Sequence, residues 1–572
     1  MEPIEKIRNI AIIAHVDHGK TTLIDKLLRQ TGALARSEMQ GERLMDSNDL
    51  EIERGITITA KNTAITWHDY RINIVDTPGH ADFGGEVERI LSMVDSVLLL
   101  VDAVEGPMPQ TRFVTQKSFE KGLNPILVVN KIDRKGARPD WVVDEVFELF
   151  DRLGATDDQL DFPVVYASAT EGIAGNSLDD LQTDMSPLLQ LIIDRVPKPK
   201  VEEEGPFQMQ ISTLDYNSYV GVIGLGRIAR GRVCPGDQVI NIDKDGLQRK
   251  GKILQVMGYH GLDRVPVTQA NAGDIVCISG VEDLKISDTL CNPALVAALP
   301  ALEVDQPTIS MTFQVNTSPF AGRSGRFVTS RNLKERLDTE LIHNVALRVE
   351  ATDSADKFRV SGRGELHLSI LIETIRREGF ELGVSRPEVI VKVVDGVKQE
   401  PYEALLIDAE VDHQGAIMEE LGMRKATMTN MVPDGKGRVR LEFVIPTRGL
   451  FGFRSEFLTI TSGRGLITSV FSHYDKAYPD DLSKRRNGVL VSMTNGKSLA
   501  FALFNLQARG RMLIGPNEDV YEGMVIGLHT RGSDLVVNPI KGKQLTNIRA
   551  AGSDENVILS APIRLMHAVI SI

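Results

Sequence analysis

The stretch Ile10-Ala-Ile-Ile-Ala-His-Val-Asp-His-Gly-Lys-Thr-Thr22 decides how the N-terminal part of this 572-residue chain folds. Its first half, Ile10 to Ala14, is an apolar run without polar alternation, which is typical of a strand buried on both faces of a parallel sheet. A short polar loop follows, and a helical pattern begins at Thr22. A strand, a tight loop and a helix in this order predict a phosphate site, because the amides of the loop and of the helix N-terminus point at the anion.

The loop itself indicates a nucleoside triphosphate. We expect the backbone amides of residues 15–19 to curl around the phosphates, Lys20 to neutralise the outer phosphates and Thr21 to bind Mg²⁺. Ala14 stands where the strict pattern G-x-x-x-x-G-K-[ST] has its first glycine, so this segment alone leaves an ordinary strand-turn-helix open. The nucleotide-binding residues assigned to this segment are Asp17, His18, Gly19, Lys20, Thr21 and Thr22.

A second segment, Asp76-Thr-Pro-Gly-His80, closes the buried run from Ile72 to Val75. A carboxylate at a strand end suits the magnesium side of a nucleotide site. We expect Asp76 to hold a water of the Mg²⁺ shell and the amide of Gly79 to reach the terminal phosphate.

Two further segments predict that the base is guanine. Asn130-Lys-Ile-Asp133 ends the run from Ile126 to Val129, and Ser168 and Ala169 end the next run, where backbone amides meet guanine O6. The carboxylate of Asp133 can accept from N1–H and from the 2-amino group of guanine, whereas adenine lacks that amino group and has an acceptor at N1. Leaving a buried carboxylate unpaired costs about 1–3 kcal/mol or more, so GTP is favoured over ATP. The residues assigned to the base are Asn130, Lys131, Ile132, Asp133, Ser168 and Ala169.

Four motifs together resemble the translational GTPase family, the elongation and initiation factors that act on ribosomes. They are His15–Thr21, Arg54-Gly-Ile-Thr57, Asp76–His80 and Asn130–Asp133, and members of the family tolerate alanine at the position of Ala14. The resemblance implies a Mg²⁺ site of Thr21, Thr57 and Asp76. It also implies that His80 orients the attacking water, behind an apolar gate of Val16 and Ile56. A surface histidine that caps a helix is the alternative for His80.

The bulk composition is that of an ordinary globular protein, with 42% hydrophobic and 25% charged residues. No apolar run approaches the roughly 20 residues that span a bilayer, and the start has no signal-peptide pattern, so we expect a cytoplasmic protein. Three widely spaced cysteines, Cys234, Cys277 and Cys291, indicate reduced thiols rather than a metal site or disulfides.

The net charge of −13 argues against a protein that coats nucleic acid by electrostatics alone. Residues 1–200 hold 22 Lys and Arg against 33 Asp and Glu, whereas residues 451–572 hold 14 against 10. This distribution fits a catalytic module in front and an RNA-facing surface behind, although ordinary scatter of surface charge explains it equally well.

The chain is too long for one core, and its patterns predict a multidomain protein of α/β, β-barrel and α+β parts. Alternating strands and helices predict a P-loop GTPase domain over residues 1–200, with helices at 110–121, 139–151 and 185–195 and a polar loop at 31–54. Short β-type runs separated by Gly or Asp predict a translation-factor β-barrel over residues 201–300.

Two segments follow the order β-α-β-β-α-β and predict ferredoxin-like domains over residues 301–390 and 391–480. We expect helices near 322–341 and 370–378 in the first, and at 413–425 and 450–461 in the second. Ser361-Gly-Arg-Gly-Glu-Leu-His-Leu368 resembles the third domain of elongation factor G, where this segment marks a strand-to-helix turn. We therefore interpret His367 as structural rather than catalytic. The second segment resembles the fifth domain of that factor, and no room remains for a fourth.

The tail, residues 481–572, alternates β-type segments with Gly-rich turns and predicts a β-rich C-terminal domain. Its segments Leu490–Arg511, Gly515–Gly527 and Lys541–Ala550 resemble the BipA (TypA) family of translational GTPases. Basic residues of this region are candidates for rRNA or tRNA contact, and each could equally be a solvated surface charge: Lys484, Arg485, Arg486, Arg509, Arg511, Lys541 and Lys543.

The resemblance implies a monomeric, ribosome-binding enzyme that hydrolyses GTP to GDP and phosphate and uses Mg²⁺. The implied role is assembly of the large ribosomal subunit and translation under cold or other stress. Its implied partners are large-subunit rRNA and tRNA in the A site, with the stringent-response alarmone as a further ligand of the GTP site. Two alternatives stay open: a LepA-like elongation factor, and a nucleotide-gated ribosome-binding module in which hydrolysis only resets binding.

Overall fold

The computed structural model describes residues 3–15, 17–33, 49–54, 57, 60–78, 84–217, 220–302, 306–344, 346–433, 437–479, 488–542 and 558–562. The chain forms two compact units. One comprises Met1–Gln306 and Leu337–Arg348, and the other comprises Pro307–Arg336 and Val349–Ile572.

An eight-stranded sheet lies at the centre of the N-terminal domain, in the order β2-β3-β1-β4-β5-β6-β7-β8. Strands β3, β1, β4, β5 and β6 run parallel, and β2, β7 and β8 are antiparallel to their neighbours. The bounds are β1 (Ile7–Ala14), β2 (Lys61–Trp67), β3 (Tyr70–Asp76), β4 (Ser96–Asp102), β5 (Asn124–Asn130), β6 (Val164–Ser168), β7 (Ile173–Gly175) and β8 (Leu181–Gln182). The parallel strands therefore bring their carboxyl ends to one edge of the sheet.

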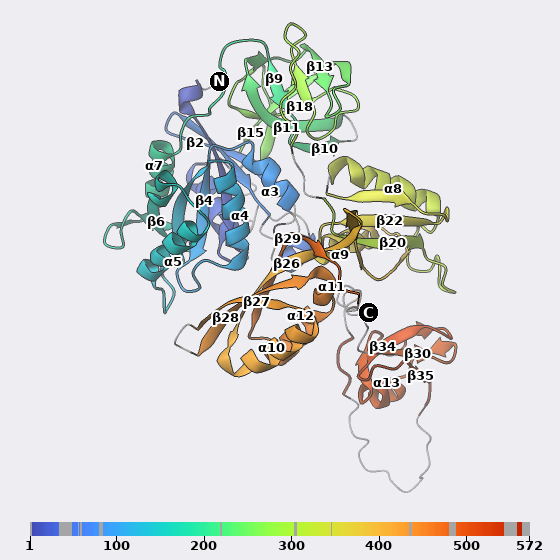
Figure 1. Cartoon of the computed structure of the whole chain (residues 1–572). Coiled ribbons are helices and arrows are strands. Elements are labelled where there is room, and N and C mark those ends of the chain that lie inside the picture. Colours follow the sequence, from blue (N-terminus) through green and yellow to red (C-terminus); the bar gives the residue numbers. More distant parts are fainter. Residues whose placement is uncertain are drawn as a thin grey trace. The chain divides into compact units, whose positions relative to one another are not determined.

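Helices cover both faces of this sheet (Figure 1). On β1, Ile10 and Ile12 pack in the cluster that contains helices α1 and α7, whereas Ala11 and Ile13 pack with α3, α4 and α5. Every residue of β1 is buried, which is why the strand shows no polar alternation. The helices are α1 (Lys20–Gln30), α2 (Asp49–Arg54), α3 (Gly84–Leu91), α4 (Pro109–Glu120), α5 (Pro139–Arg152), α6 (Asp157–Leu160) and α7 (Ser186–Arg195), after a short 3-10 turn η1 (Ile4–Lys6).

The expected doubly wound domain and its helices at 110–121, 139–151 and 185–195 are confirmed to within a residue at each end. The expectation of a loop over the whole of 31–54 is wrong at its end, where α2 forms a short helix. Lys61 on β2 pairs with the buried carboxylate of Glu51 at 2.8 Å, and this ion pair fixes α2 to the sheet. Residues 34–48 lie outside the described residues.

The second domain is an antiparallel barrel, as the short β-type runs predict. Its main sheet has the order β14-β13-β19-β9-β11-β18-β15-β16, β10 pairs with β11, and β12 pairs separately with β17. The bounds are β9 (Gln208–Gln210), β10 (Thr213–Asn217), β11 (Gly221–Arg230), β12 (Arg232–Val233), β13 (Gln238–Ile242), β14 (Gln248–Lys252), β15 (Gln255–His260), β16 (Asp263–Pro266), β17 (Ala270–Asn271), β18 (Ile275–Ser279) and β19 (Thr289–Cys291).

The barrel and the N-terminal sheet share a polar junction and an apolar cluster within the first unit. Asn73 donates to Asn9 Oδ1 at 2.8 Å and to Asp274 Oδ1 at 3.1 Å. Asn9 donates to Asp95 Oδ2 at 3.0 Å, and Arg227 of the barrel pairs with the same carboxylate at 2.8 Å. Apolar side chains of β11, β15 and β18 complete the contact by joining the cluster under α3 and α4.

The third domain has the ferredoxin-like strand order, β21-β22-β20-β23, with all of the pairs given for β20 antiparallel. When these four strands are numbered in chain order within the domain, they lie side by side in the order 2-3-1-4. The bounds are β20 (Ile309–Val315), α8 (Ser330–His343), β21 (Arg348–Ala351), β22 (Lys357–Gly362), α9 (Glu365–Arg377), β23 (Leu382–Val384) and β24 (Glu388–Val389), which also pairs with β20.

Both helices of this domain begin at residues other than those expected. Helix α8 starts at Ser330 rather than near residue 322, because the amides of Gly322, Ser324 and Gly325 donate to the carboxylate of Glu381 at 2.7–2.8 Å and hold a loop. Helix α9 starts at Glu365 rather than at residue 370. It buries residues 367–373 and 375, and the Nδ1 of the buried His367 accepts from the Arg363 amide at 3.3 Å.

The fourth domain repeats the same plan, with the order β25-β26-β28-β27. Strand β26 pairs with β28 along one edge and with β29 along its opposite edge. The bounds are β25 (Lys392–Val394), β26 (Val397–Glu410), η3 (Val411–His413), α10 (Gln414–Met423), β27 (Thr427–Pro433), β28 (Arg438–Pro446), α11 (Thr447–Leu450), α12 (Phe453–Ile460) and β29 (Leu466–Lys476). Phe453 and Phe457 of α12 fill the core between helix and sheet.

The C-terminal domain is β-rich, with the sheet order β32-β34-β30-β35 and a small β31-β33 pair. It also contains helix α13, which the β-type interpretation of the tail missed: Ala502, Leu503 and Leu506 are buried at helical spacing. The bounds are β30 (Val489–Ser492), β31 (Gly496–Lys497), α13 (Ala500–Gln507), β32 (Gly510–Met512), β33 (Asp519–Val520), β34 (Val525–His529) and β35 (Leu535–Val537).

Two of the cysteines, Cys277 and Cys291, are buried in the barrel, and Cys234 is half-buried. Burial raises the pKa of the Cys277 and Cys291 thiols. Across the described parts of the chain, no helix is both long and apolar enough to cross a bilayer.

Candidate nucleotide site

The expected nucleotide residues gather where the parallel strands end. Strands β1, β3, β4, β5 and β6 finish at Ala14, Asp76, Asp102, Asn130 and Ser168. The register aligns Asp102 with Asn130 and Asn130 with Ala167, so these strand ends are neighbours across the sheet.

The loop between β1 and α1 turns tightly and requires glycine at its last position. The His18 amide donates to the His15 carbonyl at 3.2 Å, and Asp17 adopts a φ of +64°. Gly19 has a φ of +95°, and a Cβ built there would lie 2.5 Å from Asn130 Nδ2. Helix α1 starts at Lys20, so its first amides face the loop.

Lys20 joins the first and second motifs. It is largely buried, its ammonium lies 2.8 Å from Asp76 Oδ1, and it also donates to the Thr77 carbonyl. Asp76 is fully buried, and the hydroxyl of Thr77 donates to the Ile12 carbonyl of β1 at 2.6 Å. Lys20, which is expected on the phosphate side, therefore lies next to Asp76, which is expected on the Mg²⁺ side.

Asn130 joins the loop to the base motifs. Its Nδ2 donates to the His18 carbonyl at 2.8 Å, and its Oδ1 accepts from the Ala169 amide at 2.9 Å. The side chain is 1% exposed, so both contacts are shielded from water. One side chain therefore ties together three of the four segments that the sequence singles out.

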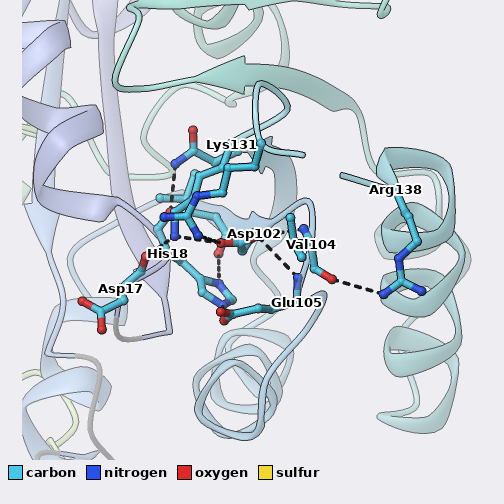
Figure 2. A network of polar contacts seen from close by, with 10 residues as sticks. Asp17, His18, Asp102, Val104, Glu105, Lys131 and Arg138 are labelled. Carbon is cyan, nitrogen blue, oxygen red and sulfur yellow. Dashed lines mark hydrogen bonds and ion pairs between the residues drawn. The ribbon is translucent and has the colours of Figure 1, made fainter. Parts of the chain in front are cut away.

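Lys131 reaches back over the loop (Figure 2). Its ammonium donates to the Asp17 carbonyl and lies 2.7 Å from Asp102 Oδ2. Asp102 is fully buried, and its Oδ1 accepts from the amides of Val104 and Glu105 at 2.7 and 3.3 Å. Burial raises the pKa of Asp102, but the Lys131 ammonium and the Val104 amide outweigh it and hold the pKa below its usual value.

His18 belongs to the loop, and its side chain is fully buried. Its Nδ1 lies 3.3 Å from the Leu100 carbonyl and its Nε2 lies 3.6 Å from Glu105 Oε2. The contact with His18 lowers the pKa of Glu105 from its ordinary value. His18 therefore supports the loop from beneath.

The remaining described site residues lie around this centre. Thr57 and Ser168 are buried, Ala169 follows β6, and Thr21 and Thr22 are half-buried in the first turn of α1. Asp133 is exposed, which differs from the buried carboxylate assumed for base selection. Its selectivity for guanine would therefore depend on the base covering it.

Several expected residues lie outside the described residues: the catalytic His80, Gly79, the gate residues Val16 and Ile56, and the basic residues Lys484, Arg485, Arg486 and Lys543. Three candidate RNA contacts are described. Arg509, Arg511 and Lys541 are exposed, which both RNA binding and simple solvation allow.

Sequence reasoning missed Asp102 and Glu105. The signal was present: Ser96–Asp102 is a buried apolar run that ends in a carboxylate, as Ile72–Asp76 does. Parallel strand ends meet at one edge, so a polar residue closing any such run is a candidate for the same site.

Comparison with known protein families assigns most of the chain. Residues 5–198 match the elongation factor Tu GTP-binding domain, and residues 221–291 match elongation factor Tu domain 2. Residues 397–485 match the elongation factor G C-terminus, and residues 487–569 match the TypA/BipA C-terminal domain.

Full-length relatives extend these matches. A protein of Escherichia coli K12 named large ribosomal subunit assembly factor BipA is 65% identical over 98% of this chain and 93% of its own length. Proteins of the same name from Haemophilus influenzae and Buchnera aphidicola are 62% and 57% identical, over 98% and 97% of this chain and 91% and 92% of their own lengths. A crystal structure from Thermus thermophilus shares the fold with a TM-score of 0.58 at 18% identity, covering 83% of this chain and 98% of its own. The chain belongs to the BipA (TypA) family of translational GTPases.

Proposed function

We propose that this protein is a GTPase that binds the large ribosomal subunit and acts in its assembly. The observation that supports this most strongly is the joining of loop, lysine and base motif through Gly19, Lys20 and Asn130. The relatives that carry the same name, large ribosomal subunit assembly factor, support the choice of partner. The family match at residues 487–569 favours this function over a LepA-like elongation factor.

The geometry of the loop and the strand ends supports the following proposed nucleotide contacts. The amides of residues 17–22 would receive the phosphates, with Lys20 as the cation for the outer ones. Asn130 would keep the loop next to the base motif, and Asp133 would pair with the guanine edge, with the amides of Ser168 and Ala169 near O6. Phosphoryl transfer depends mainly on such positioning and charge neutralisation.

Thr21, Thr57 and Asp76 fit a magnesium site, because two hydroxyls and a carboxylate are hard oxygen ligands and the Asp76 carboxylate is fully buried beside Lys20. Bound Mg²⁺ would neutralise charge on the phosphate oxygens. GTP hydrolysis would then depend on His80, which we propose orients the attacking water, with Val16 and Ile56 in front of it. The Gly79 amide would sense the terminal phosphate, so that its loss releases the segments around Thr57 and His80.

Further features of the proposal come from the family resemblance and the chain's charge. The exposed Arg509, Arg511 and Lys541 would contact rRNA or A-site tRNA together with Lys484, Arg485, Arg486 and Lys543. The protein would act as a cytoplasmic monomer in cold or other stress. The stringent-response alarmone would compete for the GTP site. The five-domain boundaries at residues 200, 300, 390 and 480 stay a prediction.

Sedimentation with purified large ribosomal subunits tests the partner. We expect the full chain to pellet with the subunits in the presence of a non-hydrolysable GTP analogue and to stay largely in the supernatant with GDP. Equal pelleting with both nucleotides, or with neither, would contradict the proposal.

A further inference from the structure

Strand β4 and the loop after it, residues 102–106, contact both halves of the nucleotide site, and no motif assigns them a role. They lie between the phosphate loop and the base motif (Figure 2). The inference drawn from these contacts rests on the proposed binding of guanine nucleotides.

The first contact with the nucleotide site is made by Asp102. This buried carboxylate is 2.7 Å from the ammonium of Lys131, which in turn donates to the Asp17 carbonyl of the phosphate loop. Arg134 is a weaker, half-exposed partner at 3.6 Å. Lys131 has a φ of +63°, and its long side chain has many rotamers, so a fixed carboxylate is needed to hold it extended over the loop.

The second contact is made by Glu105, whose carboxylate faces the Nε2 of the buried His18 at 3.6 Å. The same Asp102 oxygen that accepts from the Val104 amide also accepts from the Glu105 amide, so both contacts come from one turn. Figure 2 shows the Glu105 and His18 side chains pointing toward one another beneath Lys131 and Asp102.

The turn is itself anchored to α5. Arg138 donates through its side chain to the Val104 carbonyl at 3.2 Å and through its amide to the Ala103 carbonyl at 2.8 Å. Gly106 has a φ of +75°, and a Cβ there would lie 2.8 Å from the Trp141 ring, so α5 packs directly on the turn. The turn is therefore a rigid support rather than a free surface loop.

We propose that Asp102 is a positioning residue for guanine-nucleotide binding, which acts by holding Lys131 across the phosphate loop, with Glu105 holding the same loop through His18. Without Asp102, Lys131 must be ordered by the nucleotide itself, so binding weakens. Charge-assisted hydrogen bonds of this kind are about twice as strong as neutral ones, and their loss typically weakens binding by about tenfold or more.

The test is a double-mutant cycle on the full chain, read as the dissociation constant of fluorescent GDP. Asp102→Asn keeps an oxygen for the Val104 and Glu105 amides and removes only the charge that faces Lys131. We expect D102N and K131A each to weaken GDP binding by about tenfold or more. The double variant should be no weaker than K131A alone, because Asp102 acts through Lys131.

Additive losses in the cycle, or a D102N variant that binds GDP as tightly as the wild type, would overturn the proposal. A D102N chain that does not fold would overturn it too, since Asp102 would then have a structural role. The contact between Glu105 and His18 is tested separately. E105Q should speed GDP dissociation about threefold or more, and an unchanged rate would show that Glu105 does not hold the phosphate loop. D151N, which removes an exposed charge from α5, should match the wild type. A wild type without measurable affinity for GDP would instead refute the proposed function.

Discussion

At the residue scale, the phosphate loop depends on Gly19. Its φ of +95° disfavours any residue with a Cβ, and that Cβ would collide with the Asn130 side chain at 2.5 Å. We predict that Gly19→Ala weakens GDP and GTP binding by at least tenfold, because Asn130 must leave the loop, the base motif or both. Titration with a fluorescent guanine nucleotide measures the loss.

Gly32→Ala is the matched control for this prediction. Gly32 follows α1 with a φ of +66°, but no described heavy atom lies within 4 Å of a Cβ built there. Its substitution should cost about 1–2 kcal/mol of stability through backbone strain and leave affinity unchanged. If G32A lost as much affinity as G19A, the backbone strain rather than the collision with Asn130 would be the cause.

Single residues also show how far the sequence leads. Gly19, Lys20, Asp76 and Asn130 could be predicted because motif spacing and strand ends determine where their backbones lie. The reach of Lys131 to Asp102 and the exposure of Asp133 could not, because they depend on side-chain paths and on burial by neighbouring turns. The candidate catalytic role of His80 stays a prediction.

At the element scale, the loop before α8 is shaped by one carboxylate. Burial raises the pKa of Glu381, but hydrogen bonds from the Gly322 and Gly325 amides, the Asn316 side chain and the Ser324 amide outweigh it and lower the pKa from 4.5 to about 2. A depressed folded-state pKa contributes stability that is fully present above pH 4.5 and is lost as the pH falls toward 2.

We therefore predict that Glu381→Gln removes part of the acid dependence of stability. At pH 7 the variant should melt at a lower temperature than the wild type, and the difference should shrink as the pH falls from about 4.5 toward 2. Thermal melts followed by circular dichroism across this range give the comparison. E388Q, which alters an exposed glutamate on β24, should follow the wild type, and a constant offset for E381Q at every pH would contradict the assignment.

Element boundaries were predictable where the periodicity was clean and wrong where a tertiary contact competed with it. Helices α4, α5 and α7 match their expected residues to within one residue at each end. Helix α8 starts late because the Glu381 carboxylate takes the amides of the preceding segment. No local pattern announces a partner about 60 residues away in the chain.

At the scale of the whole molecule, the GTPase domain and the barrel are linked through buried polar groups. Burial raises the pKa of Asp95, although Arg227 and Asn9 oppose it. Arg227 of β11 and Asp95, the residue before β4, form a pair at 2.8 Å, with side chains 20% and 6% exposed. The barrel thus supplies the counter-charge for a carboxylate of the GTPase domain.

We predict that Arg227→Ala destabilises the chain by about 2–3 kcal/mol at pH 8, because it leaves a buried charge without its main partner. Without Arg227 the pKa of Asp95 rises further, so the loss should diminish as the pH falls and the carboxylate becomes protonated. Denaturant unfolding at several pH values measures this. R232A removes an exposed arginine from the neighbouring β12 and should have little effect at any pH. A loss that grows as the pH falls would contradict the account.

The domain series as a whole was predictable from motifs and turn spacing, since each domain has its own periodicity. The shared junction was not, because Asn9, Asn73 and Asp274 meet only in the fold and are far apart in the chain.

Nucleotide turnover by the full chain is the decisive assay, run with GTP and ATP in parallel, with and without purified large ribosomal subunits. We predict slow GTP hydrolysis that the subunits strongly stimulate, no such response with ATP, and loss of the stimulation in His80→Ala. Comparable hydrolysis of ATP, or GTP hydrolysis that neither the subunits nor the substitution alters, would contradict this prediction.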